Sequence, residues 1–155
     1  MSGKKFYVKD YMSTRRITIE KTATLAEAVK HMITEKTNGL VVTNSKNGIE
    51  GIISSWDIIK HVVPDYLENE DNLSSFEAEE VFAARVKQVA NDVVEKFMTK
   101  NVHTAHPADT LMDAASVLAE QGIRQLPIVN DQGVFIGYIN RTDIKRAIGE
   151  VLNIN

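Results

Sequence analysis

Apolar residues recur at helical spacing in two separate segments of this 155-residue chain. The first set is Leu25, Ala28, Val29, Met32 and Ile33, and the second is Leu111, Ala114, Ala115 and Leu118. Spacings of three and four predict an amphipathic helix in each segment. Both helices open on a threonine followed three residues later by an acid, Thr24 with Glu27 and Thr110 with Asp113, which is the spacing of a capping box.

Runs of β-branched and apolar residues predict strands around both helices. The expected strands cover 16–19, 39–43 and 50–54 in the first half of the chain, and 102–105, 126–129 and 135–139 in the second. Asn, Asp and Gly stand between the last two strands of each half, and these residues are typical of hairpin turns because they tolerate positive φ. A last helix begins near Trp56 or Thr142. Each half therefore predicts the order β-α-β-β-α.

The two halves are copies of one pattern, because the chain aligns with itself without a gap at an offset of 86 residues. The residues identical to the one 86 positions later are Val8, Met12, Thr18, Thr24, Leu25, Ala28, Leu40, Asn44, Gly51, Ile53, Asp57 and Ile58. We expect repeat 1 at 8–60, an acidic loop with a helical insert at 61–92, and repeat 2 at 93–150. A single repeat is too small for a comfortable core, so the two are expected to pack through their sheets in a mixed α/β (α+β) fold.

The insert between the repeats divides into two parts. Residues 65–75 are rich in acids and predict a solvated loop, and a helix is expected to begin at 74–77. Phe82, Val86, Val89 and Val93 form an apolar stripe on it. The stripe is expected to cover the core or another subunit, and simple packing within the chain is the alternative.

Composition excludes several classes of function. The chain has no cysteine, which rules out disulfides, thiolate zinc sites and cysteine nucleophiles and agrees with a cytoplasmic location. Its net charge of −3 disfavours a general nucleic-acid-binding surface, and no apolar run is long enough to span a membrane or to form a signal peptide. The four histidines lack the spacing of metal ligands, and no catalytic motif is present. We therefore expect neither a metal site nor an enzyme.

A third motif closes each repeat and carries the chemistry. It consists of a glycine, two apolar residues, a polar residue and, three positions on, an aspartate: Gly51-Ile52-Ile53-Ser54-Ser55-Trp56-Asp57 and Gly137-Tyr138-Ile139-Asn140-Arg141-Thr142-Asp143. Where a strand gives way to a helix, free N–H groups and the helix dipole favour a phosphate. An aspartate in the first helical turn can accept hydrogen bonds from two vicinal ribose hydroxyls. The alternative for Asp57 and Asp143 is a helix-terminal acid favoured by the dipole.

These motifs together resemble a tandem pair of CBS domains, the repeat named after cystathionine β-synthase. Further carriers of the resemblance are Met12-Ser13, Met98-Thr99 and the segment 122–129. The resemblance implies a Bateman module, in which two repeats pack about a pseudo-twofold axis and leave two clefts. Such clefts bind adenosine-containing ligands, namely AMP, ADP or ATP and sometimes S-adenosylmethionine or NAD. A flat homodimer and the absence of catalysis are also implied.

By that resemblance, basic residues at the position of Arg124 reach phosphates in the cleft between repeats. We therefore expect Asp57 to bind the ribose while Ser54 and Arg124, beside Gln125, bind the phosphate, since a guanidinium can bind phosphate in a bidentate manner. A solvated surface arginine is the alternative for Arg124.

The second cleft, at Asp143, is expected to be the weaker one. It has Asn140 in place of a hydroxyl, which Arg141 could offset with its charge, and the matching pair Asn38-Gly39 offers no cation. The residues expected to form the apolar adenine slots are Ile17, Thr18, Leu40, Thr104, Ala105 and Pro127, with plain core as their alternative.

The expected function is that of a non-catalytic regulatory module that senses cellular energy. An adenine nucleotide would draw the repeats together and thereby change the affinity for a regulated partner protein that the sequence does not identify. Binding of S-adenosylmethionine or NAD stays open. The alternative from another class is a ligand-free scaffold with degenerate clefts, which Asn140 and Asn38 favour.

Overall fold

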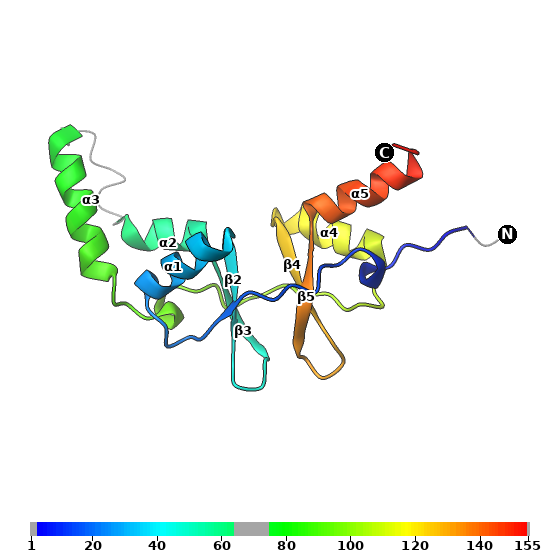
Figure 1. Ribbon diagram of the computed structural model, residues 1–155, viewed down its shortest axis with the longest axis horizontal. Coiled ribbons are helices and arrows are strands. Elements are labelled where there is room, and N and C mark those ends of the chain that lie inside the picture. The colour runs from blue at the N-terminus through cyan, green and yellow to red at the C-terminus, as the bar shows by residue number, and fades with distance from the viewer. Residues whose placement is uncertain (1–2, 64–74, 155) are drawn as a thin grey trace. The chain divides into compact units, whose positions relative to one another are not determined.

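Two small β-sheets and five α-helices make up residues 3–63 and 75–154, the parts of the chain that the computed structural model describes (Figure 1). Contacts between Cα atoms divide the chain into two compact units. Unit 1 comprises Met1–Arg16, Ser45–Ile49 and Val102–Asn155, and unit 2 comprises Ile17–Asn44 and Glu50–Asn101. None of the described helices is both long and apolar enough to cross a membrane.

Unit 2 holds the three-stranded sheet, and the helices α1 and α2 lie on one side of its strands (Figure 1). Its elements are β1 (Thr18–Ile19), α1 (Leu25–Glu35), β2 (Gly39–Thr43), β3 (Ile49–Ser54), α2 (Ser55–Val62), α3 (Ser75–Val89) and the 3-10 helix η3 (Val94–Lys96). The strand order is β1-β2-β3, with β1 parallel to β2. Ala28 and Met32 of α1 pack with Leu40 and Ile53 of the sheet in one buried cluster.

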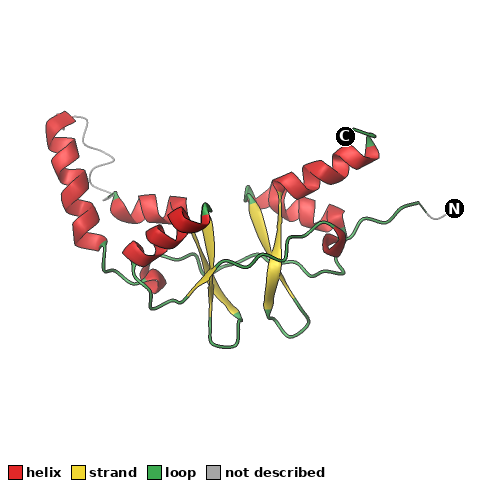
Figure 2. Ribbon diagram, viewed as in Figure 1, coloured by secondary structure: helices red, strands yellow, loops and turns green. Residues whose placement is uncertain are grey.

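Unit 1 is built on the same plan with a two-stranded sheet (Figure 2). Its elements are the 3-10 helix η1 (Val8–Asp10), α4 (Leu111–Gln121), β4 (Gln125–Val129), β5 (Phe135–Asn140) and α5 (Arg141–Val151). β4 and β5 are antiparallel, with a register shift between Ile128 and Val129. Leu118, Leu126 and Ile139 lie in the core between helices and sheet.

The predicted order β-α-β-β-α is confirmed for repeat 1, but the strand predicted at 102–105 in repeat 2 is wrong. Only Ala105 makes a bridge there, parallel to Ile128. In unit 2 the N–H of Val41 donates to the carbonyl of Ile17 (3.2 Å) and so extends β1. The residue in the place of Val41 is Pro127, which has no N–H to donate. The ladder of repeat 2 therefore stops after one bridge.

Each unit contains one repeat together with a segment from the start of the other repeat. The segment before repeat 2's first strand position packs on repeat 1, and the segment before repeat 1's first strand packs on repeat 2. In unit 2, the N–H of Leu25 donates to the carbonyl of Asp92 (2.9 Å), and Ile52 and Thr99 exchange both backbone hydrogen bonds (2.9 Å each). In unit 1 the N–H of Leu111 donates to Phe6 in the same way (2.9 Å). The compact units therefore differ from the repeats read along the chain.

The same exchange of backbone hydrogen bonds joins Ser13 and Tyr138 in unit 1, at 2.8 and 2.9 Å. Each of these residues stands 86 positions from its counterpart in unit 2. We call the two exchanged segments, 6–13 and 92–99, the leaders.

The predicted helix starts and turns are confirmed. Thr24 and Glu27 form the complete capping box of α1, and at α4 the Thr110 hydroxyl accepts the N–H of Asp113 (3.1 Å). In the two hairpin turns Asn47 and Gly133 adopt positive φ, at 60° and 78°. These turns need such residues because a left-handed backbone is costly for most side chains.

The predicted insert helix is present as α3, which lies beyond α2 on the side away from the sheet (Figure 1). Its C-terminal end packs on α1 and α2, where Val89 is 2% exposed and clusters with Leu25 and Val62. Phe82, two turns before Val89 in the predicted stripe, is 61% exposed. The acidic loop predicted at 65–75 lies outside the described residues except for Ser75, where α3 begins.

Candidate functional site

The junction between β3 and α2 holds Ser54 and Asp57 in a reciprocal pair. Ser54 is the N-cap of α2, and its hydroxyl oxygen accepts the N–H of Asp57 at 3.2 Å. The N–H and the hydroxyl of Ser54 donate to Oδ2 of Asp57 at 2.8 and 2.9 Å. The predicted strand-to-helix junction is therefore a complete capping box, in which Asp57 also has the role of a helix-terminal acid.

Thr99 is a part of this junction that the sequence prediction missed. Its hydroxyl donates to Oδ1 of Asp57 at 3.1 Å, so both carboxylate oxygens already accept hydrogen bonds. A carboxylate offers about four lone-pair positions, and the two donors from Ser54 and the one from Thr99 leave room for about one more. The sequence signal for it is the Met98-Thr99 pair, which repeats Met12-Ser13 and supports the family resemblance but does not by itself predict a contact with Asp57.

Gly51 explains why this leader lies so near the junction. A Cβ at position 51 would stand 3.0 Å from the Thr99 carbonyl oxygen and 2.6 Å from the sulfur of Met98. Gly137 of unit 1 has the same relation to Ser13 and Met12. The glycine of the motif thus admits the leader backbone, whose Thr99 side chain then reaches Asp57.

The matching junction of unit 1, between β5 and α5, keeps the cap but changes the chemistry. The side-chain oxygen of Asn140 accepts the N–H of Asp143, and the N–H of Asn140 donates to Oδ2 of Asp143, both at 3.0 Å. Asparagine caps helices as well as serine does, but its side-chain oxygen has no proton to donate. Oδ1 of Asp143 lies 3.6 Å from the Arg146 guanidinium. The two aspartates therefore have different partners.

The apolar residues predicted to form adenine slots lie mostly in the cores. Ile17 and Leu40 are buried in unit 2, and Ala105 and Pro127 are buried in unit 1. Thr18 of β1 is half-buried. Thr104, which precedes the bridge at Ala105, is exposed.

The predicted cations belong to unit 1. Arg124 is exposed just before β4, and its carbonyl accepts the N–H of Arg141 at 3.2 Å. Gln125 is half-buried and opposite Asn140 in the β4–β5 register. Ser54 and Asp57 belong to unit 2, so the expected group of Ser54, Asp57 and Arg124 draws on both units.

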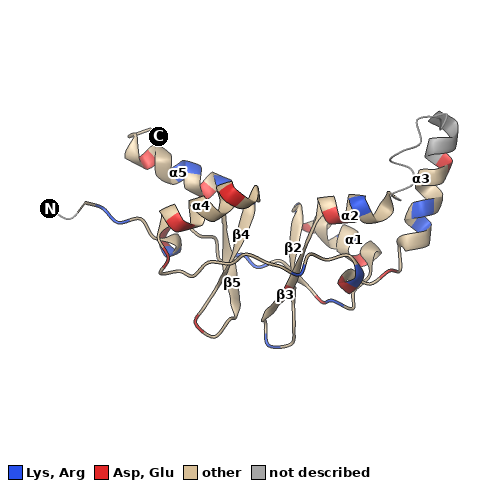
Figure 3. Ribbon diagram, turned by 180° about the vertical axis from the view of Figure 1, so that it is seen from behind, with Lys and Arg blue, Asp and Glu red and all other residues tan. Residues whose placement is uncertain are grey.

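Figure 3 colours the acidic and basic residues on the ribbon, and both kinds occur on the helices of each unit. Unit 1 supplies Arg124, Arg141 and Arg146 near its own helix junction, whereas Asn38 of unit 2 has the position of Arg124. The carbonyl of Asn38 accepts the N–H of Ser55 at 2.9 Å, as that of Arg124 does for Arg141. The two junctions therefore share the same backbone hydrogen bond, but only unit 1 has a cationic side chain at this position.

Comparison with known proteins agrees with this repeated plan. The family model for the CBS domain matches residues 8–64 and 92–150. The chain therefore belongs to the CBS domain family, as its motifs indicated. The family match covers both repeats and leaves residues 65–91 of the insert unmatched.

Two proteins of Methanocaldococcus jannaschii illustrate the similarity. The uncharacterized protein MJ1426 is 29% identical over 163 residues, covering 96% of this chain and 94% of that protein. MJ1225 is 25% identical over 142 residues, and the chain spans only 42% of its length. The solved structure of MJ1225 has a TM-score of 0.74 at 26% identity, covering 94% of this chain and 50% of that one.

A further similar structure is the CBS domain pair of protein MJ0100, solved in complex with 5′-methylthioadenosine and S-adenosyl-L-methionine. It has a TM-score of 0.70 at 26% identity and covers 96% of this chain and 99% of that chain. The expected fold, a pair of CBS repeats, is thereby confirmed.

Proposed function

We propose that this chain is a non-catalytic regulatory module that binds an adenosine-containing ligand and passes its occupancy to a partner protein. The observation that carries the proposal is the carboxylate of Asp57 at the β3–α2 junction, oriented by Ser54 and Thr99. A ribose presents two adjacent hydroxyl donors. One can use the lone-pair position that this carboxylate retains, and the other can replace the Thr99 hydroxyl on Oδ1. The ligands of MJ0100 are both adenosine derivatives, which supports the same class here.

Within that class we propose an adenine nucleotide, AMP, ADP or ATP. Ser54 lies at the N-terminus of α2, where the helix dipole favours a phosphate. The N–H groups of Ser54, Ser55 and Asp57 already donate within unit 2, so the dipole carries this preference. We assign the remaining phosphate charge to Arg124, whose exposed guanidinium can bind phosphate oxygens in pairs. The role of Arg124 rests on the sequence, and its replacement by glutamine tests it.

We rank the site at Asp57 above the site at Asp143. Asp57 has a serine hydroxyl beside it and a threonine that orients it, whereas Asp143 faces the guanidinium of Arg146 and is capped by an amide. The Arg146 guanidinium, 3.6 Å from Oδ1 of Asp143, competes with a ligand for that oxygen. Partner binding would follow ligand binding by linkage, and a homodimer is the expected assembly.

A ligand-free scaffold is the second candidate, and one observation favours it. Both aspartates serve as capping residues of α2 and α5, so each has a structural role without any ligand. The two proposals differ in what a ligand does to the melting temperature, because only a protein that binds the ligand in its folded state is stabilised by it.

The experiment is a thermal-shift and calorimetric titration with AMP, ADP, ATP, S-adenosylmethionine and NAD. At least one ligand should raise the melting temperature of the wild type, Asp57→Ala should abolish most of that shift, and Asp143→Ala should matter less. Glu27→Ala is the matched control, because it removes the capping box of α1 without touching the site. If no ligand shifts the melting temperature at millimolar concentration, the scaffold is the better account.

A further inference from the structure

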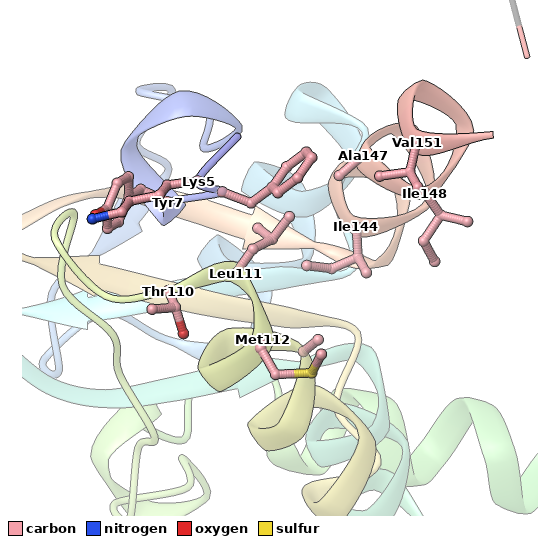
Figure 4. A pocket seen from close by; sticks show the side chains of 11 residues that line it. Lys5, Tyr7, Thr110, Leu111, Met112, Ile144, Ala147, Ile148 and Val151 are labelled. Carbon is pink, nitrogen blue, oxygen red and sulfur yellow. The ribbon is translucent and has the colours of Figure 1, made fainter. Parts of the chain in front are cut away.

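An apolar groove lies on unit 1 between the start of α4 and the second half of α5. It has a volume of about 690 Å³. Leu111 and Met112 line it from α4, Ile144, Ile148 and Val151 line it from α5, and Lys5 lies at its edge (Figure 4). Met112 is 76% exposed and Ile148 is 54% exposed. Large aliphatic side chains thus face solvent side by side, which is unusual unless they bind something.

The internal repeat shows what covers such a groove. Subtraction of 86 from the groove positions gives Leu25, Val29, Ile58 and Val62 in unit 2. These four residues cluster with Val86 and Val89 of α3. In unit 2 an amphipathic helix therefore occupies the place that is open in unit 1.

The effect of that helix is visible at one matched position. Val62 of α2 is 8% exposed, whereas Ile148, its counterpart on α5, is 54% exposed. Arg85 of α3 also donates to the carbonyls of Val62 (3.1 Å) and His61 (3.2 Å), so the helix covers polar as well as apolar atoms at the end of α2. Subtraction of 86 from Val89 gives Gly3, which has no side chain to place in the groove of unit 1.

We propose that the groove of unit 1 binds an amphipathic helix of a partner protein, in the manner in which α3 packs on unit 2. The helix presents two aliphatic residues three positions apart, as Val86 and Val89 do, to the row formed by Leu111, Ile144 and Ile148. Lys5 at the rim favours a helix with an acidic residue beside that stripe. This surface consists of residues of unit 1 alone and shares none with the Asp57 junction.

A peptide copy of α3 is the probe that the structure itself supplies. A fluorescein-labelled peptide of residues 75–93 is titrated with the full chain, and anisotropy reports binding. We expect saturable binding that Ile148→Glu weakens by about tenfold or more, because it places a charge in the apolar row. Ile59→Glu is the matched control, since Ile59 is an exposed isoleucine of α2 outside the α3 cluster, and it should leave binding unchanged.

A peptide with Val86 and Val89 both changed to glutamate should not bind, which checks that the aliphatic pair makes the contact. Melting curves establish that Ile148→Glu and Ile59→Glu are both folded. Equal affinity of wild type and Ile148→Glu would overturn the proposal, as would the absence of binding at about 1 mM chain. Concentration-dependent self-association that Ile148→Glu abolishes would also overturn it, because a second copy would then be the occupant.

Discussion

At the scale of single residues, Gly51 is closely surrounded by the leader 92–99, next to the Asp57 junction. The Met98 side chain and the Thr99 carbonyl leave no room for a Cβ there, and the neighbouring Ile52 exchanges two hydrogen bonds with Thr99. Any side chain at 51 pushes this leader away and carries the Thr99 hydroxyl off Asp57. The glycine therefore affects both stability and the orientation of the proposed ribose acceptor.

Gly51→Ala should lower the free energy of unfolding by about 1–3 kcal/mol, the range for an overpacked interior position. Gly39→Ala is the matched control, because a Cβ at 39 meets only the Ile53 carbonyl oxygen at an ordinary 3.7 Å. The control should be neutral or slightly stabilising. Urea unfolding of the two variants measures the difference, and equal values would show that the leader yields without cost.

Asp57 shows how far the sequence could predict a site residue. Its place in the first turn of a helix, after a serine cap, was predictable from the spacing alone. The hydrogen bond from Thr99 was not, because it depends on a residue 42 positions away that only the leader brings near. Local spacing specifies a cap, and tertiary contacts decide what else the capping carboxylate does.

At the scale of elements, α3 is attached to unit 2 by its C-terminal end. Val89→Ala should lower the free energy of unfolding by about 1–2 kcal/mol, since it removes two buried carbons. Phe82→Ala, in the same helix, should have little effect because that ring is largely exposed. Chemical denaturation compares the two variants, and a larger loss at Phe82 would mean that the exposed half of α3 has a contact of its own.

A second contact between elements, made by side chains, joins the N-terminal segment of unit 1 to α5. The Tyr11 hydroxyl donates to Glu150 at 2.6 Å, and the Lys4 ammonium lies 3.2 Å from the same oxygen. The Tyr11 hydrogen bond, followed by Lys4, holds the pKa of Glu150 below its ordinary value of 4.5. The same carboxylate raises the pKa of Lys4 above 10.5 and that of Tyr11 above 10.0.

These directions set the pH dependence of this contact. A lowered carboxyl pKa contributes stability above pH 4.5 that is lost as the pH falls through the folded-state pKa of Glu150. The raised pKa values of Lys4 and Tyr11 contribute stability below about pH 10 that is lost as the pH rises further. Glu150→Gln should therefore melt lower than the wild type near neutral pH.

The difference in melting temperature between wild type and Glu150→Gln should be constant from about pH 6 to 8 and vanish in acid, once the wild-type carboxyl is protonated. Lys145→Gln is the control, since it changes one exposed charge on the same helix. A difference that persists unchanged at pH 3 would show that charge at position 150 is irrelevant to the contact.

The elements also show where sequence prediction ends. Helix positions and turns followed from periodicity, caps and residues that tolerate positive φ, all of which are local. The prediction of a strand at 102–105 in repeat 2 was wrong because the residue that prevents its pairing, Pro127, lies in the neighbouring strand β4. The exchange of leaders was not predictable from the repeat, because an offset of 86 is the same whether each leader packs on its own half or on the other.

At the scale of the whole molecule, two nearly equivalent units have diverged in chemistry and in covering. Unit 2 has Ser54 and Thr99 at its aspartate and the helix α3 over its apolar groove. Unit 1 has the arginines and an open groove. We interpret this as a division of tasks, with ligand recognition centred on Asp57 and partner recognition on the groove that Ile148 lines.

The measurement that tests the ribose assignment most directly is a calorimetric comparison of the best-binding adenosine ligand with its 2′-deoxy analogue, on wild type and on Asp57→Ala. If Asp57 accepts hydrogen bonds from the ribose, loss of one hydroxyl should weaken binding to the wild type by about 10- to 100-fold. The same change should have little effect on Asp57→Ala, which has no carboxylate to lose a donor. Equal affinities of the two ligands for the wild type would contradict the account.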